Sequence, residues 1–160
     1  MKLIALGANL PSSAGPPAVT LEAALRAIAS RGVDIAQVSR FYESEAWPNP
    51  SDPSYVNAVA RVCTDLPPKE LLTLLQEVEA QFGRRRSEKN APRTLDLDIV
   101  DYEGRVEHGD PELPHPRASE RAFVLLPLSD IAPVWVHPVS GKSVSELIGD
   151  LPPAKIEPLR

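Results

Sequence analysis

The stretch Tyr55–Thr64 reads YVNAVARVCT. Its two alternating sets of side chains predict a strand, from which the rest of the fold can be worked out. The residues at 56, 58, 60 and 62 point to one side and those at 55, 57, 59 and 61 to the other, which is typical of a strand with one face on a core. Directly after it, Pro67-Pro68 predicts the start of a helix, because proline suits a first helical turn. That helix is expected to end at Gly83, since apolar side chains recur at helical spacing up to that point: Leu71, Leu75, Val78 and Phe82.

The sequence on either side completes the pattern. Residues 2–6 predict a short buried strand, and a helix with Thr20 as its N-cap is expected to run to Gly32. Residues 33–42 predict another strand, and residues 95–102 alternate again. The order strand, helix, strand, strand, helix, strand predicts an α+β protein with a ferredoxin-like βαββαβ antiparallel sheet and both helices packed on one face.

A C-terminal extension, residues 103–160, follows this unit. It holds an apolar stretch at 123–128 and then a short helix, for which Ser143 and Glu146 have capping-box spacing. The proline-rich tail, 152–160, is expected to be a surface strap or frayed.

Composition bounds the class of protein. A chain of 160 residues is the size of one domain, so we expect residues 1–160 to form a single domain. The 17 basic and 22 acidic residues give a net charge of −5, which disfavours nucleic acid as a partner. No apolar run approaches the roughly 18–20 residues of a membrane span, and the first apolar run is too short for a secretory signal, so we expect a cytoplasmic protein. The single cysteine, Cys63, excludes an internal disulfide framework.

The strongest chemical signal is the pair Asp96 and Asp98, set between Leu95, Leu97 and Ile99. Residues two apart in a strand share a face, so both carboxylates are expected to point away from the core, side by side. Mg²⁺ binds such pairs, with substrate phosphates filling its remaining positions. The alternative is the solvated face of an amphipathic strand.

A basic loop precedes this pair: Arg84, Arg85, Arg86, Lys89 and Arg93. Arginines beside a carboxylate pair suggest a phosphate clamp facing a metal site. Alternatively, they form a solvated helix exit that complements the helix dipole. That alternative accounts for Arg84 but not for Arg93, which lies just before the strand.

Two further groups are candidates for binding. His115 lies between prolines with Arg121 and Phe123 close behind, so an imidazole, a cation and an aromatic ring could converge there; a structural histidine is the alternative. Tyr55 and Asn57 share one strand face and could offer a stacking ring and an amide to a flat heterocycle, or could be ordinary sheet surface.

These motifs together resemble the 6-hydroxymethyl-7,8-dihydropterin pyrophosphokinase family of folate biosynthesis. The likeness extends over nearly the whole chain, and its segments are Leu6-Gly7-Ala8-Asn9-Leu10, Ser39-Arg40-Phe41-Tyr42, Tyr55-Val56-Asn57-Ala58, Glu79 with Gly83-Arg84, Pro92 to Ile99, Pro114-His115-Pro116, and Arg121 with Phe123-Val124-Leu125. The run PRTLDLDI at 92–99 is the most specific of them.

The resemblance implies an ATP-dependent diphosphate transfer to the pterin hydroxymethyl group, with AMP as the second product. It implies that Asp96 and Asp98 hold two Mg²⁺ ions around ATP and that Arg84 and Arg93 are catalytic. Positions at which the family contacts ATP are Gln76, Glu79, Arg84, Arg86, Arg93, Ile99, His115 and Arg121.

The resemblance also implies a pterin site, with the pterin between the rings of Tyr55 and Phe123 and held by Asn57. Ser44, Glu45 and Trp47 would line it from the adjoining loop. ATP and 6-hydroxymethyl-7,8-dihydropterin are therefore the expected partners, and a monomer is expected. The rival interpretations are a non-catalytic ferredoxin-like module, such as an RNA-recognition domain, and a metal-dependent transferase with another acceptor.

Overall fold

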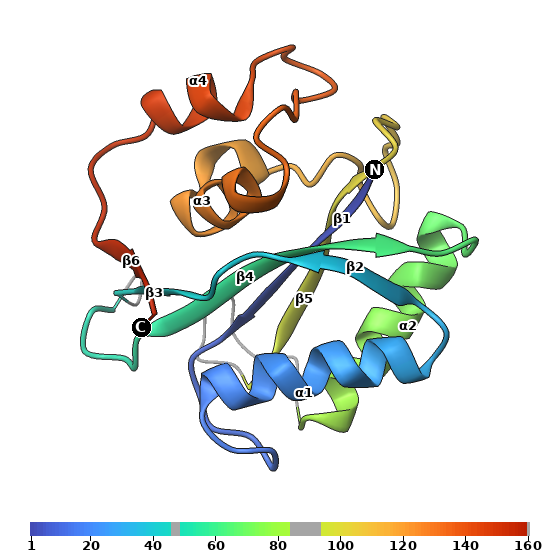
Figure 1. Ribbon diagram of the computed structural model, residues 1–160, viewed down its shortest axis with the longest axis vertical. Helices are drawn as coiled ribbons and strands as arrows, with labels where there is room; N and C mark the ends of the chain where they lie inside the picture. Colours follow the sequence, from blue (N-terminus) through green and yellow to red (C-terminus); the bar gives the residue numbers. More distant parts are fainter. Residues whose placement is uncertain (46–48, 84–93, 160) are drawn as a thin grey trace.

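The computed structural model describes residues 1–45, 49–83 and 94–159, which form an antiparallel sheet with helices on both faces (Figure 1). The strands are β1 (Lys2–Ala8), β2 (Asp34–Val38), β3 (Tyr42–Ser44), β4 (Tyr55–Cys63), β5 (Asp96–Tyr102) and β6 (Ile156–Pro158). The helices are α1 (Pro17–Ser30), α2 (Pro68–Gln81), α3 (Ala122–Ile131) and α4 (Val144–Gly149), with a 3-10 turn at Ala118–Glu120. None of the helices in these ranges has the length and hydrophobicity needed to cross a membrane.

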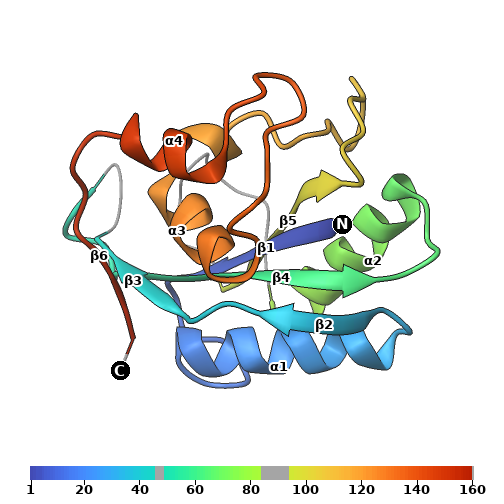
Figure 2. The ribbon, with the colours of Figure 1, turned by 45° about the horizontal axis from the view of Figure 1, so that its top comes forward.

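The strand order confirms the ferredoxin-like arrangement. The sheet runs β5-β1-β4-β3-β6, and β2 pairs with β4 beyond the end of β3, so β2 and β3 together occupy the place of one strand. Helices α1 and α2 pack on one face, as expected, and the extension supplies α3 and α4 on the other (Figure 2).

Each sheet face carries its own apolar core. The side chains at 56, 58, 60 and 62 of β4 pack with α1 and α2, whereas Val59 packs with α3 and α4. The predicted apolar face of α2 is buried, with Leu71, Leu75 and Val78 at 0% exposure. Fully burying such a side chain contributes roughly 1.5–3 kcal/mol each, so these two cores fix the sheet between its helices.

The predicted N-cap of the first helix is wrong. The helix begins at Pro17, because Pro16 and Pro17 preset the backbone for a first turn. Thr20 is instead fully buried inside that turn. Its hydroxyl lies 2.6 Å from that of Ser12 and 3.2 Å from the carbonyl oxygen of Pro16, so it ties the preceding loop to the helix.

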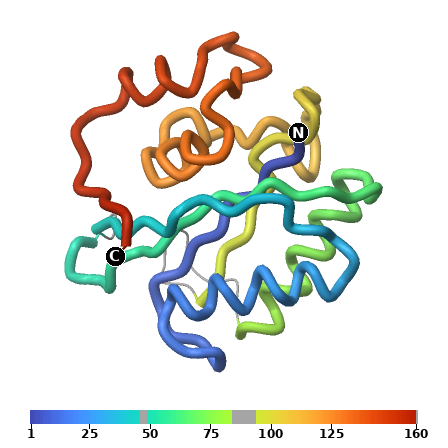
Figure 3. Tube along the Cα trace, viewed as in Figure 1, coloured from blue at the N-terminus to red at the C-terminus, as the bar shows by residue number. Residues whose placement is uncertain are grey.

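The predicted strand at 33–42 is divided at Ser39. The Ser39 side-chain hydroxyl, rather than a backbone carbonyl, accepts the hydrogen bond of the Val59 amide at 2.9 Å, which interrupts the regular ladder. The tail at 152–160 is not frayed in its described part, because β6 pairs with β3 at the sheet edge (Figure 3). The apolar stretch at 123–128 is helical, and the predicted capping box of α4 is confirmed.

A register shift in the pairing of β1 with β5 turns two consecutive side chains, Val100 and Asp101, to the α3 face. The Asp101 carboxylate is 4% exposed. It accepts hydrogen bonds from Trp135 Nε1 at 2.8 Å and from the Gly104 amide at 3.0 Å. The Asp101 carboxylate thus connects Trp135, in the segment after α3, to the end of β5.

We expect Trp135→Phe to destabilise the fold by about 1–3 kcal/mol, because one oxygen of a buried carboxylate loses its donor. Urea unfolding followed by circular dichroism measures this. The neighbouring Val134→Ala is the control, because Val134 is 81% exposed and its truncation should change stability by no more than about 0.5 kcal/mol. Equal stability of Trp135→Phe and wild type would contradict a stabilising role for this bond.

Candidate active site

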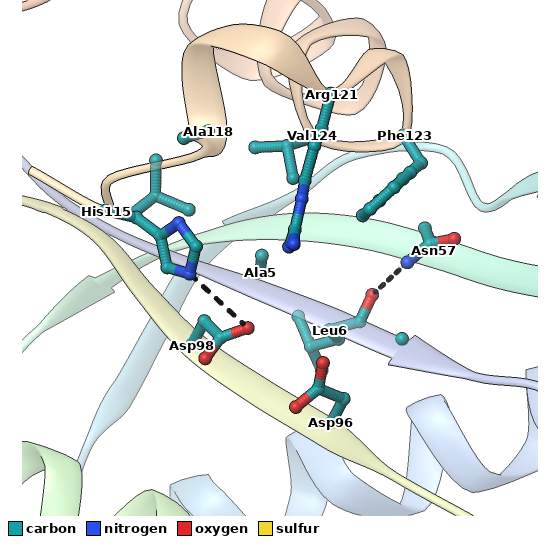
Figure 4. Close-up of a pocket in the computed structure, with 12 residues that line it drawn as sticks. Ala5, Leu6, Asn57, Asp96, Asp98, His115, Ala118, Arg121, Phe123 and Val124 are labelled. Atoms are coloured by element: carbon teal, nitrogen blue, oxygen red, sulfur yellow. Dashed lines mark hydrogen bonds and ion pairs between the residues drawn. The ribbon is translucent and has the colours of Figure 1, made fainter. Parts of the chain in front are cut away.

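A pocket opens between the sheet and the start of α3, on the face opposite α1 and α2 (Figure 4). It brings together six residues that the sequence singled out, namely Asn57, Asp96, Asp98, His115, Arg121 and Phe123. The other lining residues are Ala5, Leu6, Gly7, Val100, Ala118 and Val124.

The two carboxylates point into this pocket from β5. Their strand neighbours Leu97 and Ile99 are buried against α1 and α2, so the expected alternation is confirmed. Opposite them in β1 lie Gly7, paired with Asp96, and Ala5, paired with Asp98. Because these neighbours are small, they leave room in the pocket beside the two carboxylates.

Gly7 also lies beside Asn57, its partner in β4. A Cβ atom at Gly7 would be 2.5 Å from Asn57 Nδ2, closer than any real contact, so only glycine leaves room for this amide. Asn57 is 7% exposed, and its Nδ2 donates to the Leu6 carbonyl oxygen over 3.5 Å. Its Oδ1 is buried and has no hydrogen-bond partner within the described ranges. Such an acceptor costs about 1–3 kcal/mol unless a ligand satisfies it.

His115 faces the carboxylates from the loop before α3. Its Nδ1 accepts a hydrogen bond from the Arg117 amide at 3.2 Å, so the neutral ring carries its proton on Nε2, which lies 4.0 Å from Asp98 Oδ2. Burial and then the Arg121 guanidinium lower the pKa of His115 below its ordinary value, against the opposing effect of Asp96. At neutral pH the ring is therefore an uncharged donor directed at the pocket.

Arg121 and Phe123 come from the start of α3. Arg121 is the N-cap residue, and its guanidinium extends into the pocket between His115 and Phe123 (Figure 4). Its carbon Cζ is 5.3 Å from the centre of the Phe123 ring. The pocket thus combines acidic groups on the sheet with a cation and an aromatic ring on the opposite wall.

Three predicted nucleotide contacts lie elsewhere. Gln76 is half-buried on α2, and the Ile99 side chain is 3% exposed in the core below the sheet. Glu79 is 4% exposed, and its carboxylate accepts a hydrogen bond from the Leu97 amide at 2.8 Å. It thereby joins α2 to the strand that carries both pocket carboxylates. The nucleotide contacts of these three residues stay a prediction.

The predicted pterin residues do not all lie in this pocket, which holds Asn57 and Phe123. Tyr55 pairs with Ser44 on the neighbouring strand and is not in the lining of the pocket. Ser44 and Glu45 line a second, open hollow beside β6, together with Glu43, Ser54 and residues 155–159 other than Ile156. Trp47, Arg84, Arg86 and Arg93 lie outside the described residues, so their roles also stay predictions.

Sequence reasoning missed the small residues that make the pocket possible, Ala5 and Gly7. In the sequence, Gly7 stands out only as part of the family segment Leu6-Gly7-Ala8-Asn9-Leu10. Gly7 leaves room in the pocket because it pairs with Asn57 and Asp96, which lie 50 and 89 positions further along the chain. No local pattern carries that information.

The carboxylates of the pocket are ligands of the kind that Mg²⁺ prefers. The described residues contain no cluster of three or more histidine, cysteine, aspartate or glutamate side chains suited to a metal. Mg²⁺ does not require one, because it usually binds through one or two carboxylates and takes its other ligands from phosphates and water. Asp96 and Asp98, side by side on an open pocket, fit this ion.

Fold and pocket define an α+β domain with an open, partly acidic site on one face of its antiparallel sheet. A family model described as 7,8-dihydro-6-hydroxymethylpterin-pyrophosphokinase matches residues 3–133, and the chain belongs to this family.

Individual relatives agree with this assignment. The chain is 40% identical over 148 residues to the 2-amino-4-hydroxy-6-hydroxymethyldihydropteridine pyrophosphokinase of Synechocystis, covering 91% of this chain and 73% of the relative. It is 39% identical over 147 residues to the protein of the same name from Haemophilus influenzae, covering 91% and 89%. The crystal structure of wild-type Plasmodium falciparum HPPK-DHPS shares the fold, with a TM-score of 0.62 and 14% identity. The match covers 92% of this chain and 40% of that longer one.

Proposed function

We propose that this chain transfers diphosphate from ATP to the hydroxymethyl oxygen of 6-hydroxymethyl-7,8-dihydropterin, with release of AMP. Within a chain of this family, the observation that carries the proposal is that two carboxylates, a neutral histidine donor and an arginine line the same pocket. Carboxylates suit a divalent cation, and the two donors suit phosphate oxygens.

Mg²⁺ belongs at Asp96 and Asp98 in this proposal. Bound there, it would supply positive charge against the phosphate oxygens. The two carboxylates hold their positions because β5 is fixed on one side by β1 and on the other by Glu79. The number of ions, two by resemblance, is part of the proposal.

Arg121 and His115 would hold the nucleotide from the opposite wall. Arg121 offers a charged, planar donor, and His115 offers the Nε2 proton without adding charge. Arg84 and Arg93 remain the proposed catalytic arginines, on the basis of the resemblance alone.

Asn57 and Phe123 form the proposed pterin end of the pocket. A pterin is flat and carries ring and amino N–H donors. These features match the face of an aromatic ring and the Asn57 Oδ1, which has no hydrogen-bond partner among the residues that the structure describes. Tyr55 is proposed as the second ring.

In this proposal, catalysis depends mainly on how the two substrates are positioned relative to each other. Diphosphate transfer requires the pterin oxygen to approach the β-phosphorus in line, at about 3–3.5 Å. Phosphoryl-type transfer needs little covalent chemistry from the protein, so residues that orient both substrates account for most of the effect. The monomeric state and the cytoplasmic location stay predictions.

Calorimetry with a non-hydrolysable ATP analogue, Mg²⁺ and the pterin, in every combination, tests the proposal. We expect nucleotide binding that depends on Mg²⁺, and pterin binding that strengthens when both are present. A protein that binds single-stranded RNA and none of the three would be a recognition module of the same fold. Nucleotide binding without pterin binding would indicate a transferase with another acceptor.

A further inference from the structure

A polar cluster outside the pocket joins β3 to α3. We name it the Asp130 hub; it consists of Arg40, Tyr42 and Asp130. The Asp130 carboxylate accepts hydrogen bonds from the Arg40 amide, Nε and Nη2 at 3.1, 3.2 and 3.0 Å, and from the Tyr42 hydroxyl at 2.9 Å. Arg40 Nη2 also donates to the Tyr42 hydroxyl at 3.0 Å. The Asp130 side chain is 16% exposed.

The charge of Asp130 is maintained by these bonds. Burial raises the pKa of its carboxyl, but the hydrogen bonds from Arg40 and Tyr42 outweigh it and lower the pKa below its ordinary value. The carboxylate is therefore ionised at neutral pH, and its bonds are of the stronger, charge-assisted kind.

The hub connects the two elements that border the proposed pterin end of the pocket. Tyr42 pairs with Asn57 across β3 and β4, so their side chains are neighbours on the same sheet face. Asp130 lies seven residues, or about two turns, after Phe123 on α3, so these side chains share one side of the helix. The hydrogen bonds of the hub therefore connect α3, the helix that carries Phe123, to β3, the strand next to Asn57.

The first turn of α3 needs such support. Pro127 lies inside the helix and has no N–H, so the Phe123 carbonyl lacks its usual intrahelical hydrogen bond. The remaining contacts of α3 with the sheet include apolar ones, which stabilise the packing of the helix on the sheet but are not directional. The Asp130 bonds are directional, so they limit rotation and sliding of α3 over the sheet.

From this arrangement we propose that Asp130 is a positioning residue for the pterin end of the pocket, setting the separation of Phe123 from Asn57 through Tyr42 and Arg40. The inference rests on the proposed function, because it concerns the same site. Asp130 does not line the pocket and touches no substrate in this account.

Asp130→Asn and Tyr42→Phe test it, with Asp150→Asn as the control. Asp150 is the C-cap residue of α4 and is paired with Lys142 in an exposed ion pair, so its change should leave all constants within about twofold. We expect Asp130→Asn to raise the pterin KM about tenfold, the equivalent of roughly one charge-assisted hydrogen bond. Tyr42→Phe should raise it less, and both should leave the ATP KM and kcat within about twofold.

The separate effects on the pterin KM, the ATP KM and kcat distinguish a positioning role of Asp130 from a role in stability alone. A variant that is only less stable lowers the active fraction and hence kcat, with both KM values unchanged. That result, or an ATP KM raised as much as the pterin KM, would overturn the inference, as would an unchanged pterin KM. If Asp130→Asn does not fold, Tyr42→Phe decides by the same criteria. Wild-type enzyme without pterin turnover would instead contradict the proposed function itself.

Discussion

Replacing either pocket carboxylate, by Asp96→Asn or Asp98→Asn, is expected to lower kcat by at least about 100-fold, because each change removes a negative ligand from the proposed cation site. Both side chains border open space rather than either apolar core, so packing should survive. Steady-state assays with saturating ATP and pterin, and thermal unfolding of each variant, measure the two effects.

Asp34→Asn is the matched control, since Asp34 is an exposed aspartate on β2, far from the pocket in the sheet. It should keep wild-type turnover. Near-normal activity of either pocket variant would mean that the carboxylates are ordinary solvated residues of the strand. It would contradict the assignment of a metal site.

Gly7→Ala is the second change with a large expected effect. Its new Cβ would be 2.5 Å from Asn57 Nδ2, so the Asn57 amide must move. We expect pterin affinity to fall at least about tenfold, since a displaced polar contact costs about 1–3 kcal/mol. Nucleotide binding in the presence of Mg²⁺ should be retained, because the atoms nearest to the new Cβ belong to Asn57 and to the Val56 backbone, not to the pocket carboxylates.

A control and a double variant make this test specific. Gly109→Ala places its Cβ in open space, and Gly109 has no left-handed backbone angle, so it should match wild type. In Gly7→Ala with Asn57→Ala the clash is gone, so thermal stability should recover while pterin binding does not. Undiminished pterin affinity in the Gly7→Ala single variant would contradict the assigned geometry of Asn57.

Local periodicity predicted much of this molecule. The alternation of residues 55–64 and 95–102 identified both strands and turned Asp96 and Asp98 to the correct face. The helical spacing of α2 identified its buried side. These features depend on neighbours in sequence, which is why a single chain is enough to find them.

The features that sequence reasoning missed depend on distant partners. The proline pair at 16–17 outweighed Thr20 as the helix start, and Ser39 divided a strand through a bond to Val59. The hub joins residues 90 positions apart, Arg40 and Asp130. The sequence predicts many of the residues of the site. The shape of the site, however, depends on the register in which the strands pair.

The nucleotide product tests the central claim most directly. Wild-type protein is incubated with Mg²⁺, ATP and 6-hydroxymethyl-7,8-dihydropterin, and the nucleotides are separated and quantified against the pterin consumed. Diphosphate transfer predicts one AMP per pterin and no ADP beyond background, because the acceptor oxygen attacks the β-phosphorus. Stoichiometric ADP would mean transfer of the γ-phosphoryl group, and no turnover with this pterin while another acceptor reacts would mean a different substrate; either result would contradict the account.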